Sequence, residues 1–348
     1  MAQQGTRRRS RVNRLGVISH CAGSRSSRTE LRETVELACV AEELGFDSFW
    51  LAQHHFGAQR GHSPSPLVVL AAVAERTSRI RLGTAVIVGS LEDPIRLAED
   101  AATVDALSGG RLELGLGAGA DADIARRFGR NHDSRHADLR STVETLVELL
   151  EGGLVTPDAR GIRDRIWLGT ASRQGIDLAT RLGLGVLSGR SSSPAGPTDA
   201  GAAQLLAEYV AAANRPRVGL SRPVVCSDDV ASARNLITDQ ISEWVTRGIG
   251  TGRFPSGFTA SDYLDTGHMY HGSAETIADE LRLDPGLPFA TDLLCNVQPV
   301  RLTLSQWTPI LMGIAQRLRP LLTEGEHPVA ELPENSVVVA DHHDRRAG

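Results

Sequence analysis

One stretch of this 348-residue sequence decides its fold class: Ile80-Arg81-Leu82-Gly83-Thr84-Ala85-Val86-Ile87-Val88. Apart from Arg81 and Thr84 it is apolar at odd and even positions alike, so a strand here would be buried on both faces. Such a strand is typical of a parallel sheet whose two sides are covered by helices. Asp93-Pro94 follows and predicts the start of a helix, because an N-cap residue precedes proline at the first helical position.

Strand-like and helical segments alternate on both sides of this stretch. Strands are expected at 15–19, 46–51, 80–88, 111–116, 165–168, 185–188, 217–221 and 291–297. Helices are expected from Ser27, where Ser27-Arg28-Thr29-Glu30 predicts a capping box, and at 65–77, 94–107, 134–150, 172–182 and 304–318. Alternation without hairpins predicts a parallel α/β sheet, and eight units favour its closure into a (β/α)8 TIM barrel with loop insertions.

The barrel is expected to occupy residues 14–322 as one domain. Residues 1–13 are rich in arginine, and residues 323–348 are acidic and contain proline, so both are predicted to be disordered tails. Two stretches interrupt the alternation, one rich in Ser, Pro and Gly at 189–201 and one rich in Gly and Thr at 230–270. They follow the sixth and seventh strands, and we interpret them as loops that close over the active site.

Composition and charge exclude several classes of protein. The 42 acidic residues outnumber the 37 basic ones, all of them arginine, so neither nucleic acid nor an anionic membrane is an expected partner. The lack of lysine also excludes chemistry that needs a lysine nucleophile. No run of roughly 18 apolar residues predicts a membrane span, and no apolar segment of a secretory signal follows the N-terminal arginines. The four cysteines are too scattered for a disulfide framework or a zinc motif, so a cytoplasmic location is expected.

Active sites of (β/α)8 barrels lie at the C-terminal ends of the strands. At the end of the second strand, only one of the adjacent His54 and His55 is expected to face the barrel mouth, because successive strand residues point to opposite faces. No carboxylate stands at metal-ligand spacing, so we expect no metal and prefer a general acid–base role for that histidine. The other candidates at strand ends are His20, Cys21, Gln53, residues 85–89, Gly117-Ala118-Gly119, Thr170-Ala171-Ser172, Ser188 and Ser221.

Two glycine-containing turns offer places for a ligand. Residues 115–120 formally match the dinucleotide fingerprint G-x-G-x-x-G/A, but they follow the fourth strand and no clear helix comes next. We prefer the interpretation that glycine lets a ligand approach the backbone closely. Thr170-Ala171-Ser172-Arg173-Gln174-Gly175 opens a helix, whose free N–H groups and hydroxyls suit an anion. The same residues could serve only as an N-cap, and both interpretations stay open.

Several segments together resemble the bacterial luciferase-like, flavin-dependent monooxygenase family. The resemblance is dense over residues 46–190 and thinner beyond, where the order of strands and helices carries it. Each segment alone is weak, whereas their combination in this order is specific. The matching segments are Phe49-Trp50-Leu51-Ala52-Gln53-His54-His55-Phe56, residues 80–88, residues 93–100 with Asp105, Ser108-Gly109-Gly110-Arg111-Leu112, Gly115, Gly119, Phe128-Gly129, Arg135 and Ile166-Trp167-Leu168-Gly169.

The resemblance implies a barrel that binds reduced FMN at the C-terminal ends of its strands. It implies that His54 transfers protons, that the Ala85–Val86 peptide bond is cis beneath the flavin ring, and that the phosphate contacts fall on Arg135 and around Ser172. The full set of cofactor-binding residues expected on this basis is Ala85, Val86, Gly117, Ala118, Gly119, Arg135, Thr170, Ala171, Ser172, Gln174, Gly175 and Ser188.

Two residues depart from the family pattern. Gln53 replaces the usual acidic residue before the histidine pair, which is expected to alter how the pair is oriented. Ala118 stands where luciferase itself has an arginine of its phosphate clamp. Light emission from a long-chain aldehyde is therefore not expected.

The reaction implied by the resemblance is two-component monooxygenation. A partner reductase would deliver FMNH2, and one oxygen atom of O2 would enter a small organic substrate while the protein orients the cofactor and excludes water. Two alternatives stay open: hydride transfer with a deazaflavin on the same barrel, and a flavin-binding protein without catalysis. Assembly into a homodimer also stays open.

Overall fold

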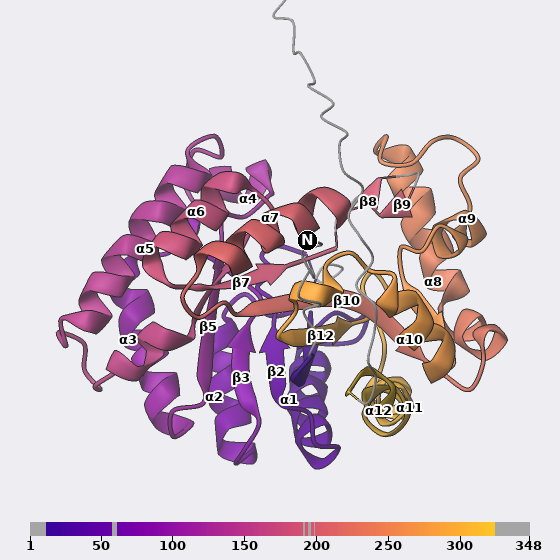
Figure 1. Ribbon diagram of the computed structural model, residues 1–348, viewed down its shortest axis with the longest axis horizontal. Coiled ribbons are helices and arrows are strands. Elements are labelled where there is room, and N and C mark those ends of the chain that lie inside the picture. The colour runs from indigo at the N-terminus through magenta and orange to yellow at the C-terminus, as the bar shows by residue number, and fades with distance from the viewer. Residues whose placement is uncertain (1–11, 58–60, 191, 194–195, 198, 324–348) are drawn as a thin grey trace, which may run out of the picture.

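The computed structural model describes residues 12–57, 61–190, 192–193, 196–197 and 199–323 (Figure 1). Its parallel strands form a closed ring, because each is hydrogen-bonded to the next and the last pairs with the first. This closure confirms the predicted (β/α)8 barrel. In ring order the strands are β1 (Arg14–Ser19), β2 (Ser48–Leu51), β3 (Arg81–Thr84), β5 (Leu112–Gly117), β6 (Ile166–Gly169), β7 (Gly185–Ser188), β10 (Val218–Cys226) and β12 (Asp292–Asn296).

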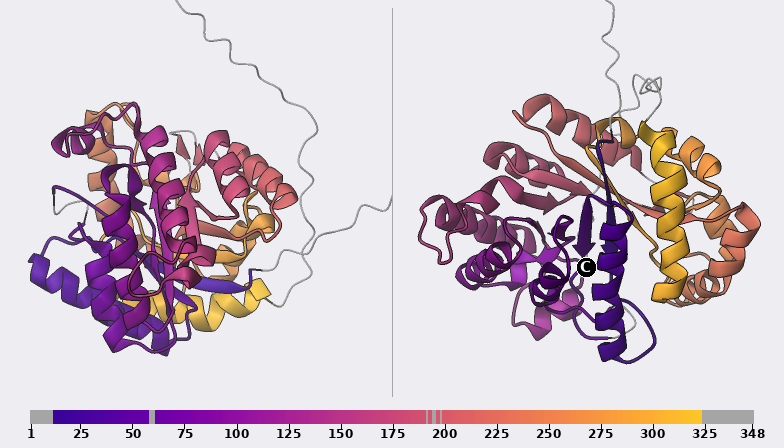
Figure 2. Two further views of the ribbon diagram at one scale, coloured as in Figure 1. Left: turned by 90° about the vertical axis from the view of Figure 1, so that its left-hand side faces the viewer. Right: turned by 90° about the horizontal axis from the view of Figure 1, so that it is seen from below.

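Helices cover the outside of the barrel, as two further views show (Figure 2). Asp93 caps α3 as predicted, since its carboxylate accepts from the N–H groups of Ile95 and Arg96 at 2.9 and 3.0 Å. The longer helices are α1 (Ser27–Glu43), α2 (Pro66–Arg76), α3 (Pro94–Leu107), α5 (Arg135–Glu151), α6 (Arg173–Leu182), α7 (Asp199–Ala212), α8 (Val230–Gly250), α10 (Ala274–Arg282) and α11 (Leu304–Gly313). The shorter elements are β4 (Ile87–Val88), α4 (Ala122–Arg127), β8 (Ser192–Ser193), β9 (Gly196–Pro197), α9 (Ala260–Asp265), β11 (Tyr270–Gly272) and α12 (Arg319–Thr323).

Two general features of the described part of the chain bear on function. None of its helices combines the length and the hydrophobicity that crossing a bilayer requires. Within the same residues, no three His, Cys, Asp or Glu side chains gather closely enough to hold a metal ion.

The decisive stretch 80–88 is not one continuous strand. Strand β3 ends at Thr84, β4 begins at Ile87, and the Ala85–Val86 peptide bond between them is cis. The cis bond expected from the family resemblance is therefore present. Strand β3 pairs with both of its neighbours, whereas β4 pairs with β5, so the chain changes course at the mouth of the barrel.

The predicted loop at 230–270 is largely wrong, because α8 occupies its first half. Four buried residues of α8 recur every four positions: Ala233, Ile237, Ile241 and Val245. This spacing places them on one face of a helix, which packs against the rest of the protein. The Gly and Thr content of the stretch masked that pattern.

The predicted capping box at Ser27 is also wrong. Helix α1 is capped by Ser26, whose Oγ accepts a hydrogen bond from the Thr29 N–H at 3.2 Å. The Glu30 carboxylate, which a capping box would turn back onto the helix start, is instead bound by Arg25. The charge-assisted hydrogen bonds from Arg25 therefore hold the Glu30 carboxylate in place of the backbone contact that a capping box would make.

The structure describes only three residues of the two predicted tails, namely Val12, Asn13 and Thr323. Val12 is 5% exposed and belongs to the core, and the Asn13 N–H donates to the Thr291 carbonyl at 3.0 Å, so these two residues are not part of a solvated tail. Thr323 ends α12, whereas residues 1–11 and 324–348 lie outside the described residues. The loop expected at 189–201 gives way to α7 at Asp199.

Two tryptophans fill the middle of the barrel. The rings of Trp50 and Trp167 meet edge to face with centroids 5.7 Å apart. Gly83 and Gly185 make room for them, because an added Cβ would lie 2.1 and 2.4 Å from the respective indole. A thin layer of apolar side chains packs on the two rings. It consists of Ile18, Leu187 and Leu294, with Ala85 and Val86 at its edge.

We expect Gly83→Ala to lower the free energy of unfolding by about 1–3 kcal/mol, the usual cost of overpacking a dense core. Chemical denaturation measures the loss. Gly201→Ala is the matched control, because an added Cβ on α7 meets no atom within 4 Å and should leave stability equal or slightly higher. Equal stability of the two variants would contradict tight packing of Trp50.

Candidate functional site

An open cleft of about 1190 Å³ lies at the C-terminal ends of β5 and β6. The starts of two helices face it, since Arg135 is the first residue of α5 and Ser172 is the N-cap of α6. Most of the expected cofactor-binding residues line this cleft: Val86, Gly117, Ala118, Gly119, Arg135, Thr170, Ala171, Ser172, Gln174 and Gly175.

A second cavity of about 810 Å³, the chamber, lies above the barrel interior. Its floor is the apolar layer that contains Ile18, Leu187 and Leu294. Ala85 also lines the chamber, and Val86 lines both cavities. The cleft and the chamber are therefore adjacent, and Gly169, Thr170 and Ala171 line both of them as well.

Ser188 does not join this group. It is 3% exposed, and its neighbour Leu187 faces the chamber, so alternation along β7 points Ser188 away from the barrel axis. Arg190, two residues further on, does line the chamber and was missed by the sequence analysis. It stacks over the Tyr270 ring at 4.4 Å. Its place in a stretch rich in Ser, Pro and Gly concealed it.

The turn between β6 and α6 acts as an N-cap and also faces the cleft. The Ser172 Oγ accepts from the Gly175 N–H at 3.2 Å, and the Thr170 Oγ1 accepts from the Ser172 N–H at 3.1 Å. An added Cβ on Gly175 would lie 2.1 Å from the Thr170 Oγ1, so only glycine allows this tight turn. The capping interpretation is confirmed, and the position of the turn leaves it available to an anion.

Positive charge gathers at the α5 side of the cleft. The Arg135 guanidinium donates to the His132 carbonyl at 3.0 Å, which holds it against the wall of the cleft. Partial burial, and then the charges of Arg135 and His132, lower the pKa of His136. Arg140 also lines the cleft, although no sequence pattern showed which exposed arginine of α5 would face it.

Glycines at the strand ends pack around Val86. An added Cβ on Gly117 or Gly169 would lie 2.6 or 2.9 Å from the Val86 side chain. Gly117, which belongs to the residues that matched a dinucleotide fingerprint, thus serves close packing beside the cis peptide bond. A closed barrel, in which β5 is the fourth strand, excludes the Rossmann interpretation.

The adjacent histidines His54 and His55 make different contacts. The Nε2 of His54 lies 2.8 Å from the Nδ1 of His20, whereas the His55 ring meets Phe128 edge to face at 4.7 Å. Both line a third cavity of about 510 Å³, which shares Ala118, Gly119, Ala120 and Arg135 with the cleft. His54 therefore lines a cavity that adjoins the cleft, while His55 is turned to an aromatic neighbour.

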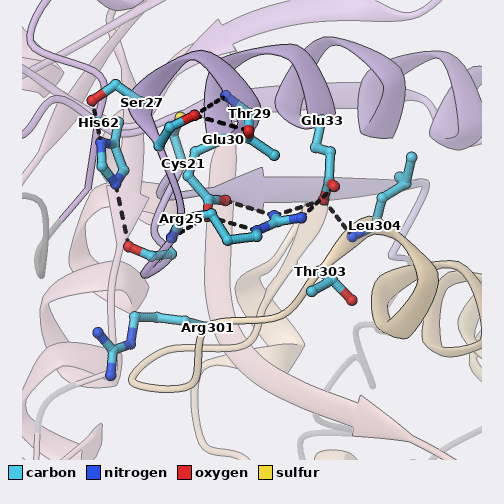
Figure 3. A network of polar contacts seen from close by, with 12 residues as sticks. Cys21, Arg25, Ser27, Thr29, Glu30, Glu33, His62, Arg301, Thr303 and Leu304 are labelled. Carbon is cyan, nitrogen blue, oxygen red and sulfur yellow. Dashed lines mark hydrogen bonds and ion pairs between the residues drawn. The ribbon is translucent and has the colours of Figure 1, made fainter.

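The loop that carries His20 is held by a group of charged contacts (Figure 3). Arg25 binds the carboxylates of both Glu30 and Glu33 on α1. Glu33 in turn accepts a hydrogen bond from the Leu304 N–H at 2.8 Å, which ties α1 to the start of α11. Glu30 is only 4% exposed, so its pairing with Arg25 anchors the loop to a buried charge that needs a partner.

Gln53 ties three segments together below the histidine pair. Its Oε1 accepts from the Val88 N–H at 2.7 Å, and its Nε2 donates to the Pro64 carbonyl at 3.1 Å and to the Glu92 Oε1 at 3.0 Å. A carboxylate, the usual residue at this position in the family, could accept from Val88 but could not donate to Glu92. The amide of Gln53 is therefore matched to the carboxylate of Glu92.

We expect Gln53→Glu to destabilise the fold by about 2 kcal/mol at neutral pH, because two carboxylates would face each other in a largely buried site. The loss should shrink below about pH 5, where protonation of one carboxyl restores a donor. The double variant Gln53→Glu/Glu92→Gln exchanges the two groups and should recover most of the stability. A double variant as unstable as Gln53→Glu in chemical denaturation would contradict the pairing.

Relatives of two chemical kinds match parts of the chain. Over 122 residues, 34% of each chain, it is 36% identical to the oxygenase component of flavin-dependent trigonelline monooxygenase from Acinetobacter baylyi. Over 124 residues, 34% of this chain and 37% of the relative, it is 37% identical to F420-dependent glucose-6-phosphate dehydrogenase from Amycolatopsis mediterranei. The chain spans about a third to a half of the length of these and other curated relatives.

Among solved structures, the monooxygenase RslO1 from Streptomyces bottropensis has a TM-score of 0.74 at 24% identity, over 88% of this chain and 99% of that one. That similarity shows a shared fold. The family model described as luciferase-like monooxygenase matches residues 14–283, well over half of the chain. The chain therefore belongs to the luciferase-like monooxygenase family.

Proposed function

We propose that the protein is the oxygenase component of a two-component, FMN-dependent monooxygenase. The observation that carries this proposal is that a cleft bordered by Arg135 lies next to a chamber with an apolar floor, and that Val86 lines both. FMN has the matching shape and charge, since an anionic phosphate is joined to a flat, largely apolar ring. A separate reductase would supply the reduced cofactor, and the relative named as an oxygenase component supports this division.

The cleft fits the phosphate end of FMN. The starts of α5 and α6 both face it, and each contributes partial positive charge and backbone N–H groups. Arg135 adds a full positive charge at the wall. After burial, the charges of Arg135 and His132 contribute to the lowered pKa of His136, as expected where the local potential is positive and favours an anion.

The chamber fits the ring end. The Val86 side chain lines both cavities. The neighbouring Gly117 and Gly169 have no side chains that would fill the space around it. Ile18, Leu187 and Leu294 form the apolar floor. These residues would hold a planar group across the mouth and exclude water beneath it.

Reduced FMN, when bound, would supply the two electrons that let one oxygen atom of O2 enter the substrate while the other leaves as water. The chain itself would hold the substrate in the chamber and keep that space dry. His54 would move a proton at one of its ring nitrogens. This role rests on its place on the rim of the site, beside Ala118 and Gly119.

A deazaflavin is the second candidate cofactor, because the relative named as an F420-dependent dehydrogenase is as similar to this chain as the flavin-dependent one. Hydride transfer would then replace oxygen insertion on the same barrel. Titration of the protein with FMN and with a deazaflavin, followed by absorbance, separates the two candidates. Consumption of O2 coupled to substrate hydroxylation supports only the first, and binding of FMN without turnover would leave a flavin-binding protein.

We expect Arg135→Ala to weaken FMN binding by about 1.5–3 kcal/mol, the worth of a hydrogen bond to a charged group. Riboflavin, which lacks the phosphate, should bind wild type and variant equally well, and fluorescence titration measures both ligands. Arg173→Ala is the control, because Arg173 is exposed, pairs with Glu208 and should not affect FMN. If Arg135→Ala weakened the binding of FMN and riboflavin equally, Arg135 would not contact the phosphate, and the phosphate site would lie elsewhere.

We expect His54→Ala to lower turnover by about 10²–10⁴-fold, the usual contribution of a general acid or base. FMN binding should persist, because the cleft residues remain in place. Substrate-dependent O2 uptake with a flavin reductase measures turnover. His55→Ala is the matched control, since His55 faces Phe128 and its loss should cost much less. Near-normal turnover of His54→Ala would remove His54 from the mechanism.

A further inference from the structure

His20 and His54 come together from two neighbouring strands. His20 directly follows β1 and His54 follows β2, and these strands pair in parallel with Ser19 opposite Leu51. The Nδ1 of His20 lies 2.8 Å from the Nε2 of His54, and the ring centroids are 5.1 Å apart. At this distance the two nitrogens share one proton, so the rings constrain each other's protonation.

His20 is the neutral member of the pair. Burial, and then the neighbouring His54 ring, lower the pKa of His20 to about 3. The charged side chains that share a cavity with His20 are Glu30 and Glu33 from α1 and Arg301 from the segment before α11. Arg25 binds both of these carboxylates. A neutral imidazole can accept at one nitrogen while it carries its proton on the other.

We propose that His20 is a positioning residue for His54, with the Nδ1 of His20 accepting a hydrogen bond from the Nε2–H of His54. This direction suits both states of His54, because neutral and protonated His54 can each donate the same bond. The opposite direction fails once His54 gains a proton, since both of its nitrogens then donate. The Nδ1 of His54 is therefore the nitrogen that gains and loses the proton. The inference rests on the acid–base role proposed for His54.

The surrounding loops leave the pair little room to separate. The His62 N–H donates to the Cys21 carbonyl at 2.8 Å, which joins the loop after β2 to the loop after β1. Gly61 packs against both histidines, because an added Cβ would lie 2.2 Å from the His20 carbonyl oxygen and 2.7 Å from the His54 Cδ2. The pair is thus set by tertiary packing before any ligand binds.

The protonated nitrogen of His54 can be identified from the ¹⁵N chemical shifts of its ring in cofactor-free protein. We expect the Nε2–H tautomer at neutral pH in the wild type. This measurement needs neither FMN nor turnover, so it is separate from the test of the proposed function. A His54 ring protonated at Nδ1 would overturn the proposal, whichever cofactor the protein uses.

The variants His20→Asn and His20→Leu form a matched pair. Asn keeps an acceptor close to the position of Nδ1, whereas Leu removes it while filling similar space. We expect His20→Leu to lower the protonation constant of His54 about tenfold, the size expected when a hydrogen bond to a charged group is lost. The pH profile of turnover should move to lower pH by the same factor, and His20→Asn should restore both quantities.

An unchanged titration of His54 in His20→Leu would overturn the proposal. If His20→Leu does not fold, the wild-type tautomer and the His54 titration in His20→Asn decide the question. Affinity for FMN, measured alongside, should be the same in both variants because neither touches the cleft. A loss of FMN binding in both would show that His20 supports the fold of the site rather than the protonation of His54.

Discussion

The packing of Trp50 and Trp167 against glycine inside the barrel is the constraint on which the rest of the site depends. Each indole occupies space that a Cβ on Gly83 or Gly185 would fill. Because the rings fill the middle of the barrel, a thin apolar layer above them is enough to close the interior. A ligand bound in the chamber would therefore lie across the mouth, above this layer, which suits the planar ring of the proposed cofactor.

The cationic end of the site comes from helix starts and not from the strand ends. Ala118 removes the arginine that luciferase itself has after this strand, and the cleft is instead bordered by Arg135 on α5 and the N-cap of α6. Charge on a helix start acts together with the partial charge of the free N–H groups. In the proposed function these helix starts hold the phosphate, at the positions that the family resemblance implies.

Polar contacts between loops set the orientation of the rim. Gln53 links the segment after β2 to Val88 in β4 and to Glu92, and the anchored loop after β1 brings His20 to His54. Each contact joins residues more than thirty positions apart. The rim is therefore ordered by hydrogen bonds between side chains, while the barrel beneath it is ordered by its backbone ladder and its packed core.

The local sequence pattern was enough to predict the barrel. Buried strands, helix caps such as Asp93 and the alternation of strands and helices each depend on residues that are close together in the sequence. The family motifs located the cleft for a related reason, since the ends of parallel strands always meet on one face of a barrel. The sequence prediction failed at α8, where the Gly and Thr content concealed a stripe of apolar residues. It also failed at Ser188, because the side chain at this position of β7 points away from the barrel axis. The partners of His54 and Gln53 were decided only by the tertiary structure, because side-chain direction and loop path depend on packing between distant segments that no local pattern encodes.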